Sequence, residues 1–490
     1  MYMWDGIFVP SFGFRVDKQK YYAMSSAPLF ADSETVILDR EVFRLPDDPS
    51  FRSSSRSNSW SFVLHTPRSI RDRMPWRTNV SLYYNRSSNV EPAAGRVDVY
   101  GDPIGSPDGK TKDYGFAINT LDDKVSLKVT WYETTVKNAA LDNFGGTYMI
   151  WGAEAWAQSF AWANLQRGRS GGWADYTNGY DPTGIVAMDT PEGGWTDEQT
   201  AYAQAVGDAI SQAYFDTALP ASWYQLWNIN VASLQNVEPG ASTPFLTGTQ
   251  PPGLTITGDT LSKGVEFELA AQPIRGLNIA INAAKTDATR LNMAQSLVDW
   301  VESRWAVYNT PVTYQGQQVG VIGDVRFWNG GYSPGESLRG KFGREFMGPY
   351  WLYRIQENSN VPELRPWRFN LVANYSFNEG MLRGFNIGGS YRWQDKQIIG
   401  YPVLPGATIN DPRAFDLTDP YMGPSERNID MWVGYSRKLT EKVDWRIQLN
   451  VRNLFADEGL IPVTVQPDGS PAVSRIPDLT SWTLTNTFSF

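Results

Sequence analysis

Apolar and polar residues alternate with a period of two along most of this chain. The clearest example is the segment 443–455, where Val443, Trp445, Ile447, Leu449 and Val451 share one parity and charged or amide residues hold the other. Such alternation is typical of a β-strand with two chemically different faces. The same pattern occurs in eleven further segments, 7–14, 59–65, 79–85, 113–119, 124–131, 264–269, 277–283, 367–377, 385–393, 429–435 and 481–490. The sequence therefore predicts twelve strands.

The connections between these strands alternate between short and long. Short ones lie at 67–75, 121–124, 273–276, 378–381 and 438–442, and long ones at 17–58, 88–111, 138–257, 289–365, 401–426 and 456–478. In an antiparallel sheet, strict alternation places every tight turn at one end and every long loop at the other. The adjacent carboxylates Asp122 and Asp123 fall in a tight turn and are interpreted as turn formers rather than as an acid/base pair.

The chain ends on SWTLTNTFSF, residues 481–490, which has one hydroxyl face and one nearly apolar face. Asn486 is the exception on the apolar face. Period-two alternation fits a membrane barrel with its apolar side facing outward, and it also fits a soluble sandwich with that side facing inward. Periodicity cannot separate the two. The loop asymmetry and the terminal aromatic Phe490 favour the barrel, which has short turns at one end and long loops at the other.

The predicted fold class is therefore all-β, an antiparallel transmembrane β-barrel of about twelve strands with long external loops that contain short helices. Its apolar face would contact lipid, and rings such as Trp393 and Trp445 would form interfacial belts. No stretch reaches the ~20 apolar residues of a membrane-spanning helix. The opposite face would line an aqueous lumen, and its predicted polar residues are Lys128, Glu266, Glu268, Asp444, Arg446 and Arg452.

Two connections, 138–257 and 289–365, are longer than structureless loops usually are and are expected to be folded, functional external insertions. Residues 196–199 form a capping box before a helical pattern at 201–215. A second helix is predicted at 293–308. Rings in the first insertion are candidates for stacking against substrate, with packing of the loop itself as the alternative. The candidates are Trp173, Trp195, Trp223, Tyr224 and Trp227. For Trp151, Trp156 and Trp162, at helical spacing, packing is favoured.

The composition of the chain excludes several classes of function. The net charge of −9 and a pI near 5.0 argue against nucleic-acid binding, which uses basic surfaces. The chain has no cysteine and one histidine, His65, which lies in an alternating run and is interpreted as an ordinary strand residue. No phosphate-binding loop, dinucleotide fingerprint or metalloprotease motif is present. The sequence therefore predicts no catalytic residues, no metal site and no cofactor, and we expect a protein that is not an enzyme.

The amino-terminal segment MYMWDGIFVPSF lacks the basic and small-residue features of a signal peptide, and it has the pattern of a strand interior. From this we expect the chain to be a truncated product or a partial reading frame of a longer protein.

Three segments together resemble the carboxyl-terminal part of the barrel of a TonB-dependent outer-membrane receptor. SKGVEFEL at 262–269 is followed by QPIRGLNIAINAA, in which a proline marks the short turn. RPWRFNLVANYSF at 365–377 is followed, after a turn, by GFNIGGSYRW. NVRNLF at 450–455 precedes a loop and the last strand, ending in TFSF. The resemblance extends over essentially the whole chain.

This resemblance implies a 22-stranded barrel filled by a plug in the intact parent. About ten strands, the plug and the segment that engages the TonB complex have no counterpart here. The implied partners are outer-membrane lipid, the barrel-assembly machinery acting on the last strand that ends at Phe490, and, only through the missing amino-terminal region, the TonB complex. The implied location is the bacterial outer membrane.

The implied activity is capture of a bulky nutrient and its energy-dependent passage inward. Candidate ligands are an oligosaccharide, a cobalamin-like compound or a metal chelate. The tryptophan-rich loops and the single histidine favour a carbohydrate or another neutral organic ligand. Two alternatives stay open: a passive twelve-stranded channel, closed by pairing of the first strand with the last, and a soluble glycan-binding β protein.

Overall fold

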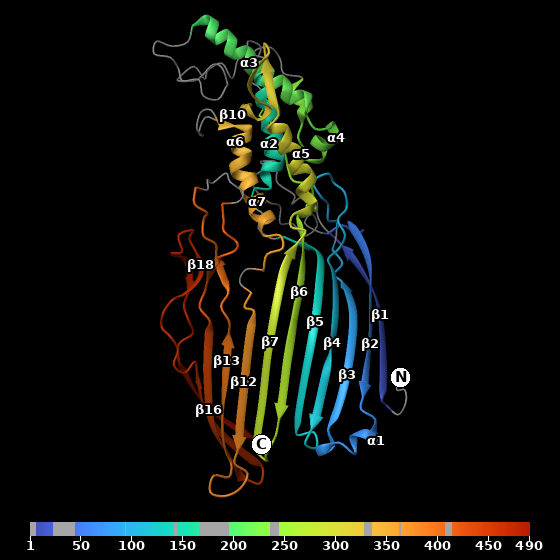
Figure 1. Cartoon of the computed structure of the whole chain (residues 1–490), viewed down its shortest axis with the longest axis vertical. Helices are drawn as coiled ribbons and strands as arrows, with labels where there is room; N and C mark the ends of the chain where they lie inside the picture. The colour runs from blue at the N-terminus through green and yellow to red at the C-terminus, as the bar shows by residue number, and fades with distance from the viewer. Residues whose placement is uncertain are drawn as a thin grey trace.

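The computed structural model describes residues 6–22, 45–93, 95–141, 146–165, 196–235, 245–327, 336–361, 364–406 and 414–490. Its main feature is one curved, barrel-like antiparallel sheet with a helical unit above one end (Figure 1). The sheet has twelve strands in the order in which they follow along the chain. They are β1 (Phe8–Tyr21), β2 (Phe51–His65), β3 (Asn79–Val90), β4 (Asp108–Thr120), β5 (Val125–Ala140), β6 (Thr257–Ala271), β7 (Leu277–Leu291), β12 (Trp367–Ser376), β13 (Phe385–Gln394), β16 (Glu426–Thr440), β17 (Val443–Arg452) and β20 (Ser481–Ser489).

All twelve strands predicted from the alternation are therefore confirmed, and neighbouring strands pair antiparallel throughout. Several extend further toward the long loops than the pattern indicated. β5, for example, continues to Ala140, nine residues beyond the predicted end at Trp131. The polar upper parts of these strands lack the apolar alternation that marks their lower parts, so the pattern underestimates their length.

The short and long connections lie at opposite ends of the sheet, as the sequence predicted (Figure 1). One short connection carries α1 (Arg68–Arg71) and the 3₁₀ turn η1 (Pro75–Arg77). In the turn between β4 and β5, Leu121, Asp122 and Asp123 all have positive φ, from 56° to 62°. Aspartate tolerates this left-handed region better than most residues do, so the turn-forming role assigned to the two carboxylates is confirmed.

The sheet is open at both edges. Within the described part of the chain, β1 pairs only with β2 and β20 pairs only with β17. A closed twelve-stranded channel would require these two strands to pair with each other, and they do not. The strand order therefore does not support the passive-channel alternative.

The connections from β5 to β6 and from β7 to β12 fold together into one helical unit, which we call the cap. The first contributes α2 (Tyr148–Leu165), α3 (Asp197–Asp216), α4 (Ala221–Leu226) and η2 (Val231–Leu234). The second contributes η3 (Gln295–Leu297), α5 (Val298–Tyr308), β8 (Pro311–Tyr314), β9 (Gln317–Val321), η4 (Ile322–Asp324), β10 (Arg326–Phe327), β11 (Glu336–Ser337), α6 (Leu338–Phe342), the π-helix η5 (Gly343–Met347) and α7 (Gly348–Ile355). Both predicted helices are present, as α3 and α5.

Two of the remaining long loops are stiffened by short ladders. β14 (Ile398–Gly400) pairs with β15 (Tyr421–Met422), and β18 (Ile461–Val465) pairs with β19 (Pro471–Arg475). Arg365 lies beneath these loops, nearly buried, and donates to the backbone oxygen of Pro424 at 3.0 Å and to the Glu426 carboxylate. Arg475 also pairs with Glu426. Two arginines on one carboxylate therefore anchor the loops to the top of β16.

Candidate functional site

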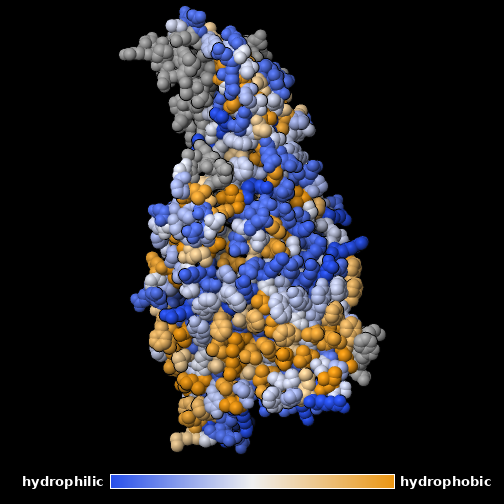
Figure 2. All heavy atoms as spheres, viewed as in Figure 1, coloured by the Kyte–Doolittle hydropathy of each residue, from blue (hydrophilic) through white to orange (hydrophobic). Residues whose placement is uncertain are grey.

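One face of the sheet carries exposed apolar rows. The register places Phe12 opposite Trp60, Phe62 opposite Tyr84 and Val265 opposite Trp131 on this face, which we call the outer face. Phe12 is 77% exposed, and Phe62, Leu82, Trp131, Phe267, Met431 and Leu484 are exposed as well. In Figure 2 hydrophobic residues form a broad band across the lower part of the sheet, toward the short turns. Soluble proteins rarely expose a contiguous apolar surface of this extent.

Aromatic rings lie at both ends of the apolar band. On β13, Phe385 and Trp393 lie on the outer face, opposite Tyr435 and Phe369 respectively. Eight residue steps span about 27 Å along a strand, which is about 20 Å along the axis of a barrel whose strands tilt by about 40° and is comparable with the roughly 25 Å apolar height of a membrane barrel. The Phe385 and Tyr435 rings lie 4.6 Å apart. Rings at both ends of an apolar band match the girdles that membrane barrels place at the two interfaces.

Asn486, the polar residue that interrupts the apolar face of the last strand, has a partner. Trp445 on β17 donates its indole N–H to the Asn486 side-chain oxygen at 3.3 Å. An amide on a lipid-facing surface would otherwise lose its hydrogen bonds with water. The exception in the pattern is therefore explained by the neighbouring strand, which the sequence of the last strand alone could not show.

The opposite, inner face carries the polar residues. Lys128 lies opposite Glu268, with Nζ and Oε1 3.8 Å apart, and Glu266 lies one inner-face position along β6 from Glu268. Asp444, Arg446 and Arg452 lie on the inner face of β17. All six residues predicted to line a lumen thus share one face of the sheet. His65 also lies there, with Nδ1 2.8 Å from the Ser81 hydroxyl.

Aromatic side chains brace the inner face by lying across glycines. Tyr83 on β3 crosses Gly115 on β4 and donates to the Val129 carbonyl on β5 at 3.1 Å. A Cβ at Gly115 would lie only 2.6 Å from the Tyr83 oxygen, so the glycine makes room for the ring. This is the pairing of an aromatic ring with a strand glycine that pins the strand register.

The same arrangement occurs twice more. Tyr132 crosses Gly264 and reaches the Thr286 hydroxyl at 2.7 Å. Trp432 crosses Gly388 and donates to the Asn374 side-chain oxygen at 2.9 Å. Each ring therefore links three adjacent strands on the inner face.

A cavity of about 680 Å³ lies on the inner face near the short turns. Arg275, Arg383, Arg446, Asn374 and Trp432 are among its lining residues. Arg275 is paired with Glu379 at 3.0 Å in the turn region. The cavity therefore has a mainly polar, basic wall, and one of the residues predicted to line the lumen, Arg446, contributes to it.

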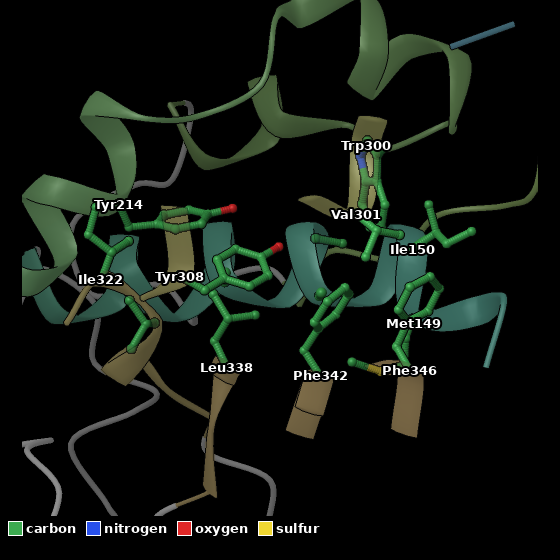
Figure 3. Close-up of a cluster of buried hydrophobic side chains, with 14 of the residues drawn as sticks. Met149, Ile150, Tyr214, Trp300, Val301, Tyr308, Ile322, Leu338, Phe342 and Phe346 are labelled. Carbon is green, nitrogen blue, oxygen red and sulfur yellow. The ribbon is translucent and has the colours of Figure 1, made fainter. Parts of the chain in front are cut away.

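The cap has the main hydrophobic core of the molecule. Its buried side chains come from both insertions and include Ile150 on α2, Trp300 on α5 and Phe342 on α6 (Figure 3). The stacked Phe342 and Phe346 rings lie 4.7 Å apart. No side chain of the twelve main strands belongs to this core among the described residues. The apolar residues of the cap thus face one another, whereas those of the sheet face outward.

The predicted stacking residues divide into two groups. Trp223, Tyr224 and Trp227 on and after α4 are at most 4% exposed. Trp223 stacks on Trp227 at 5.4 Å and on Trp300 at 6.2 Å, and Trp227 donates to the Val99 carbonyl at 3.1 Å. Their rings pack against protein and present no free face to a ligand in this conformation. Trp173 and Trp195 lie outside the described residues.

A buried ion pair joins the two insertions. The Arg304 guanidinium on α5 donates from Nε to Glu154 Oε1 at 2.7 Å and from Nη2 to Oε2 at 3.2 Å. Tyr214 donates to the same carboxylate at 2.8 Å, and Tyr308 donates to its other oxygen. Both charged side chains are almost fully buried. The carboxylate of α2 is thus held by side chains from α3 and α5.

The surroundings fix the protonation states of this cluster. Burial raises the pKa of Tyr214 and of Tyr308 well above the ordinary value, and the Glu154 charge raises both further. Burial by itself would lower the pKa of Arg304, but the Glu154 carboxylate raises it, and the net shift is upward. The tyrosines therefore remain donors and Arg304 remains charged. This arrangement has the features of a structural link and lies away from any open surface.

A group of half-exposed rings lies at the surface of the cap. Trp156 stacks near Phe245 with ring centres 6.1 Å apart and lies 6.4 Å from Tyr148. The Lys341 ammonium lies 5.5 Å from the centre of the Trp156 ring. Helical spacing assigned Trp156 to packing and gave no sign that Phe245, 89 positions away, would join it. No local sequence signal could have shown this group, because it depends on how the insertion folds.

Two features are absent from the described residues. No group of three or more histidine, aspartate or glutamate side chains is arranged to hold a metal ion there. Within the same residues, no helix is both long and apolar enough to cross a bilayer.

No protein-family model matches the sequence, and no curated protein matches it. Several solved structures match at low similarity. The ferric-catecholate import receptor Fiu from E. coli K12 shares 12% identity, with a TM-score of 0.41, over 98% of this chain and 42% of its own. The siderophore receptor PiuA from Acinetobacter baumannii shares 11%, with a TM-score of 0.40, over 98% of this chain and 40% of its own.

The alcaligin outer-membrane receptor FauA from Bordetella pertussis shares 9% identity, with a TM-score of 0.36, over 92% of this chain and 40% of its own. This chain thus spans about 40% of the length of these receptors.

Proposed function

We propose that the sheet is part of the wall of an outer-membrane β-barrel, and that the protein is a receptor that takes up a bulky nutrient. In the intact protein, uptake is coupled to energy through the TonB complex. The observation that carries this proposal is the exposure of the apolar rows on the outer face, from Phe12 on β1 to Leu484 on β20. Only a non-aqueous surrounding makes such a face favourable.

The inner face supports the same proposal. Charged and amide residues such as Lys128, Glu268 and Arg446 share the face opposite the apolar rows, as residues that line the aqueous lumen of a barrel do. A soluble sandwich would bury its apolar rows between sheets. Here those rows are exposed, and the other sheets among the described residues have only two strands each, so the soluble alternative is not favoured.

The cap belongs to the capture step in this proposal. It stands at the end of the sheet where the long loops lie, which corresponds to the external side of an outer-membrane barrel. Oligosaccharides, cobalamin-like compounds and metal chelates remain the substrate classes. Trp173 and Trp195 are still proposed contacts. Assembly of the wall would use the last strand, ending at Phe490, as the signal for the barrel-assembly machinery.

Uptake by cells tests this proposal directly. Cells with the chromosomal gene and cells lacking it are given labelled ferric chelates, cobalamin and oligosaccharides, with and without a protonophore. We expect one class to accumulate only in cells with the gene, and the protonophore to abolish the accumulation. Gene-dependent uptake that persists with the protonophore would contradict energy coupling and support a passive channel. Recovery of the protein in the soluble fraction would contradict the membrane assignment.

A further inference from the structure

The outer face carries a band of charge immediately beyond the upper aromatic row. On β3, β4 and β5 this row consists of Tyr84, Tyr114 and Trp131, which lie opposite one another in the register. The next outer-face positions toward the long loops are Arg86, Lys112 and Glu133. Two residues along a strand correspond to about 7 Å. The charges therefore lie one headgroup layer beyond the rings.

Basic residues predominate in this band. Lys112 and Lys263 share one carboxylate, Glu133, at 3.6 and 3.2 Å. Further along the same face lie Arg56 on β2, Lys110 on β4, which pairs with Asp108 at 3.1 Å, and Lys285 on β7, which pairs with Asp287 at 3.4 Å. On the inner face of the same strands, acids such as Asp113, Glu266 and Glu268 offset the bases. The excess of positive charge is thus confined to the outer face, in a chain whose net charge is −9.

One pair of like charges lies directly opposite in this band, Arg86 on β3 and Lys112 on β4. Like charges across a strand pair are destabilising when nothing lies between them. Lys112 is half exposed, and Arg86 is exposed. An anionic group from outside the protein would relieve this repulsion.

We propose that the outer face of β1–β7 binds the phosphate groups of anionic lipid headgroups, in the leaflet on the long-loop side. This inference rests on the proposed membrane location of the sheet. The aromatic row sets the depth at which the sheet lies in the membrane, because aromatic rings prefer the boundary between hydrocarbon and headgroups. Basic residues next to an anionic membrane surface attract it. The lipid is selected by Arg86, Lys112 and Lys263, and the apolar band below supplies contact that does not depend on the headgroup.

Quenching of tryptophan fluorescence by brominated lipids tests the membrane location and the headgroup site separately. The purified chain is placed in mixed micelles with lipids brominated on the acyl chains, either zwitterionic phosphatidylcholine or phosphate-bearing anionic phosphatidylglycerol. Bromine quenches tryptophans that contact the acyl chains, such as Trp60 and Trp131. We expect both lipids to quench, with tighter binding of the anionic lipid. The preference should weaken as salt is added, since exposed charges are screened.

The charge variants locate the selectivity. Arg86→Gln is expected to lower the preference for the anionic lipid about fivefold, the effect of one basic residue near an anionic surface. Combining it with Lys112→Gln and Lys263→Gln should abolish the preference and leave quenching by phosphatidylcholine unchanged. Lys128→Gln, which removes the same charge from the inner face, is the matched control. It should change neither the preference for the anionic lipid nor the quenching by phosphatidylcholine.

Three results decide between the claims. Quenching by neither lipid would overturn the membrane location itself. Equal quenching by both lipids at low salt would leave the membrane location standing and overturn the headgroup site. An anionic preference that survives the triple variant, or that falls equally with Lys128→Gln, would place the selectivity elsewhere and also overturn the site.

Discussion

The sheet and the cap place their large apolar side chains in opposite directions. On the outer face of the sheet, Phe12 is 77% and Leu82 is 52% exposed, whereas Trp227 and Trp300 in the cap are fully buried. Both regions are rich in aromatic residues, so composition does not separate them. The spacing of apolar residues along the sequence does separate the two regions. Alternation by two gives one free face, and the nearly continuous apolar helix α2 gives a segment buried on most sides.

The difference shows which surroundings each region needs. The cap buries its apolar residues within the protein and carries its own core. The sheet has little core of its own, since Val129 and Val451 are among the few buried apolar residues on its main strands. Its outer face requires hydrocarbon instead. Removal of lipid or detergent is therefore expected to affect the sheet first, and loss of internal contacts to affect the cap first.

Breaking the buried ion pair should have the largest effect, and it should be confined to the cap. Arg304→Met leaves the Glu154 carboxylate buried without its cation, which typically costs about 3–5 kcal/mol. Urea unfolding followed by near-ultraviolet circular dichroism of the cap tryptophans measures this. Arg275→Met, which removes the exposed pair with Glu379, is the control and should cost about 0–1 kcal/mol. Equal costs would contradict the structural role of the pair.

Introducing charge on the two faces of one strand sharpens the comparison within the sheet. Ile281 lies on the outer face of β7 and the adjacent Asn282 on the inner face, beside Glu268. Ile281→Arg is expected to cost about 2–4 kcal/mol in lipid, as for arginine near the middle of a membrane barrel. Asn282→Arg should be close to neutral. Guanidinium unfolding in phospholipid vesicles gives both values. A larger cost for Asn282→Arg than for Ile281→Arg would contradict the assignment of Ile281 to the lipid-facing side.

The glycines beneath the inner-face rings provide a test that does not depend on lipid. Gly115→Ala places a methyl group 1.9 Å from the Val129 backbone oxygen and 2.6 Å from the Tyr83 oxygen, so the strands must shift, and it should cost at least the roughly 1–3 kcal/mol that is usual for overpacking. Gly109, on the same face of β4, has only one neighbour at 3.5 Å, so Gly109→Ala should be nearly neutral. The free energy of unfolding in detergent distinguishes them. Similar values would contradict the close approach of Val129 and Tyr83 to Gly115.

Alkaline pH should weaken the cap slightly. Tyr214 and Tyr308 keep their protons in the folded cap because burial raises the pKa of each, while in the unfolded chain they ionise near pH 10. Their contribution is complete below pH 10 and falls as the pH rises, by about 1 kcal/mol for each tyrosine near pH 10.5. Tyrosinate absorbance checks this. Ionisation of both tyrosines before the cap unfolds would contradict their buried, protonated state.

The sequence predicted the sheet almost completely because each strand carries its own signal. Alternation in 443–455 indicates a strand without reference to any other segment, and it also places Asp444 and Arg446 on one face. The lengths of the connections predicted which turns share an end. Local patterns of this kind are the part of a fold that can be inferred from one sequence.

The cap could not be predicted, because its contacts join distant segments. Glu154 and Arg304 are 150 positions apart, and neither stands out except as a charged residue within an apolar helical pattern. Trp223 and Trp227 were candidates for ligand stacking because they lie in a turn-like sequence, yet α5 supplies Trp300 to cover them. Whether a ring meets ligand or protein depends on which insertion folds over it, and the local sequence does not carry that information.

The most direct test of the account is the accessibility of one strand to two reagents in lipid. The chain has no cysteine, so single cysteines carrying spin labels can be placed at 265 to 269 on β6. We predict that oxygen, which concentrates in hydrocarbon, relaxes labels at Val265, Phe267 and Leu269, and that a water-soluble nickel chelate relaxes those at Glu266 and Glu268. Access of the nickel chelate to Val265, Phe267 and Leu269, or access of neither reagent, would contradict contact between the outer face and lipid.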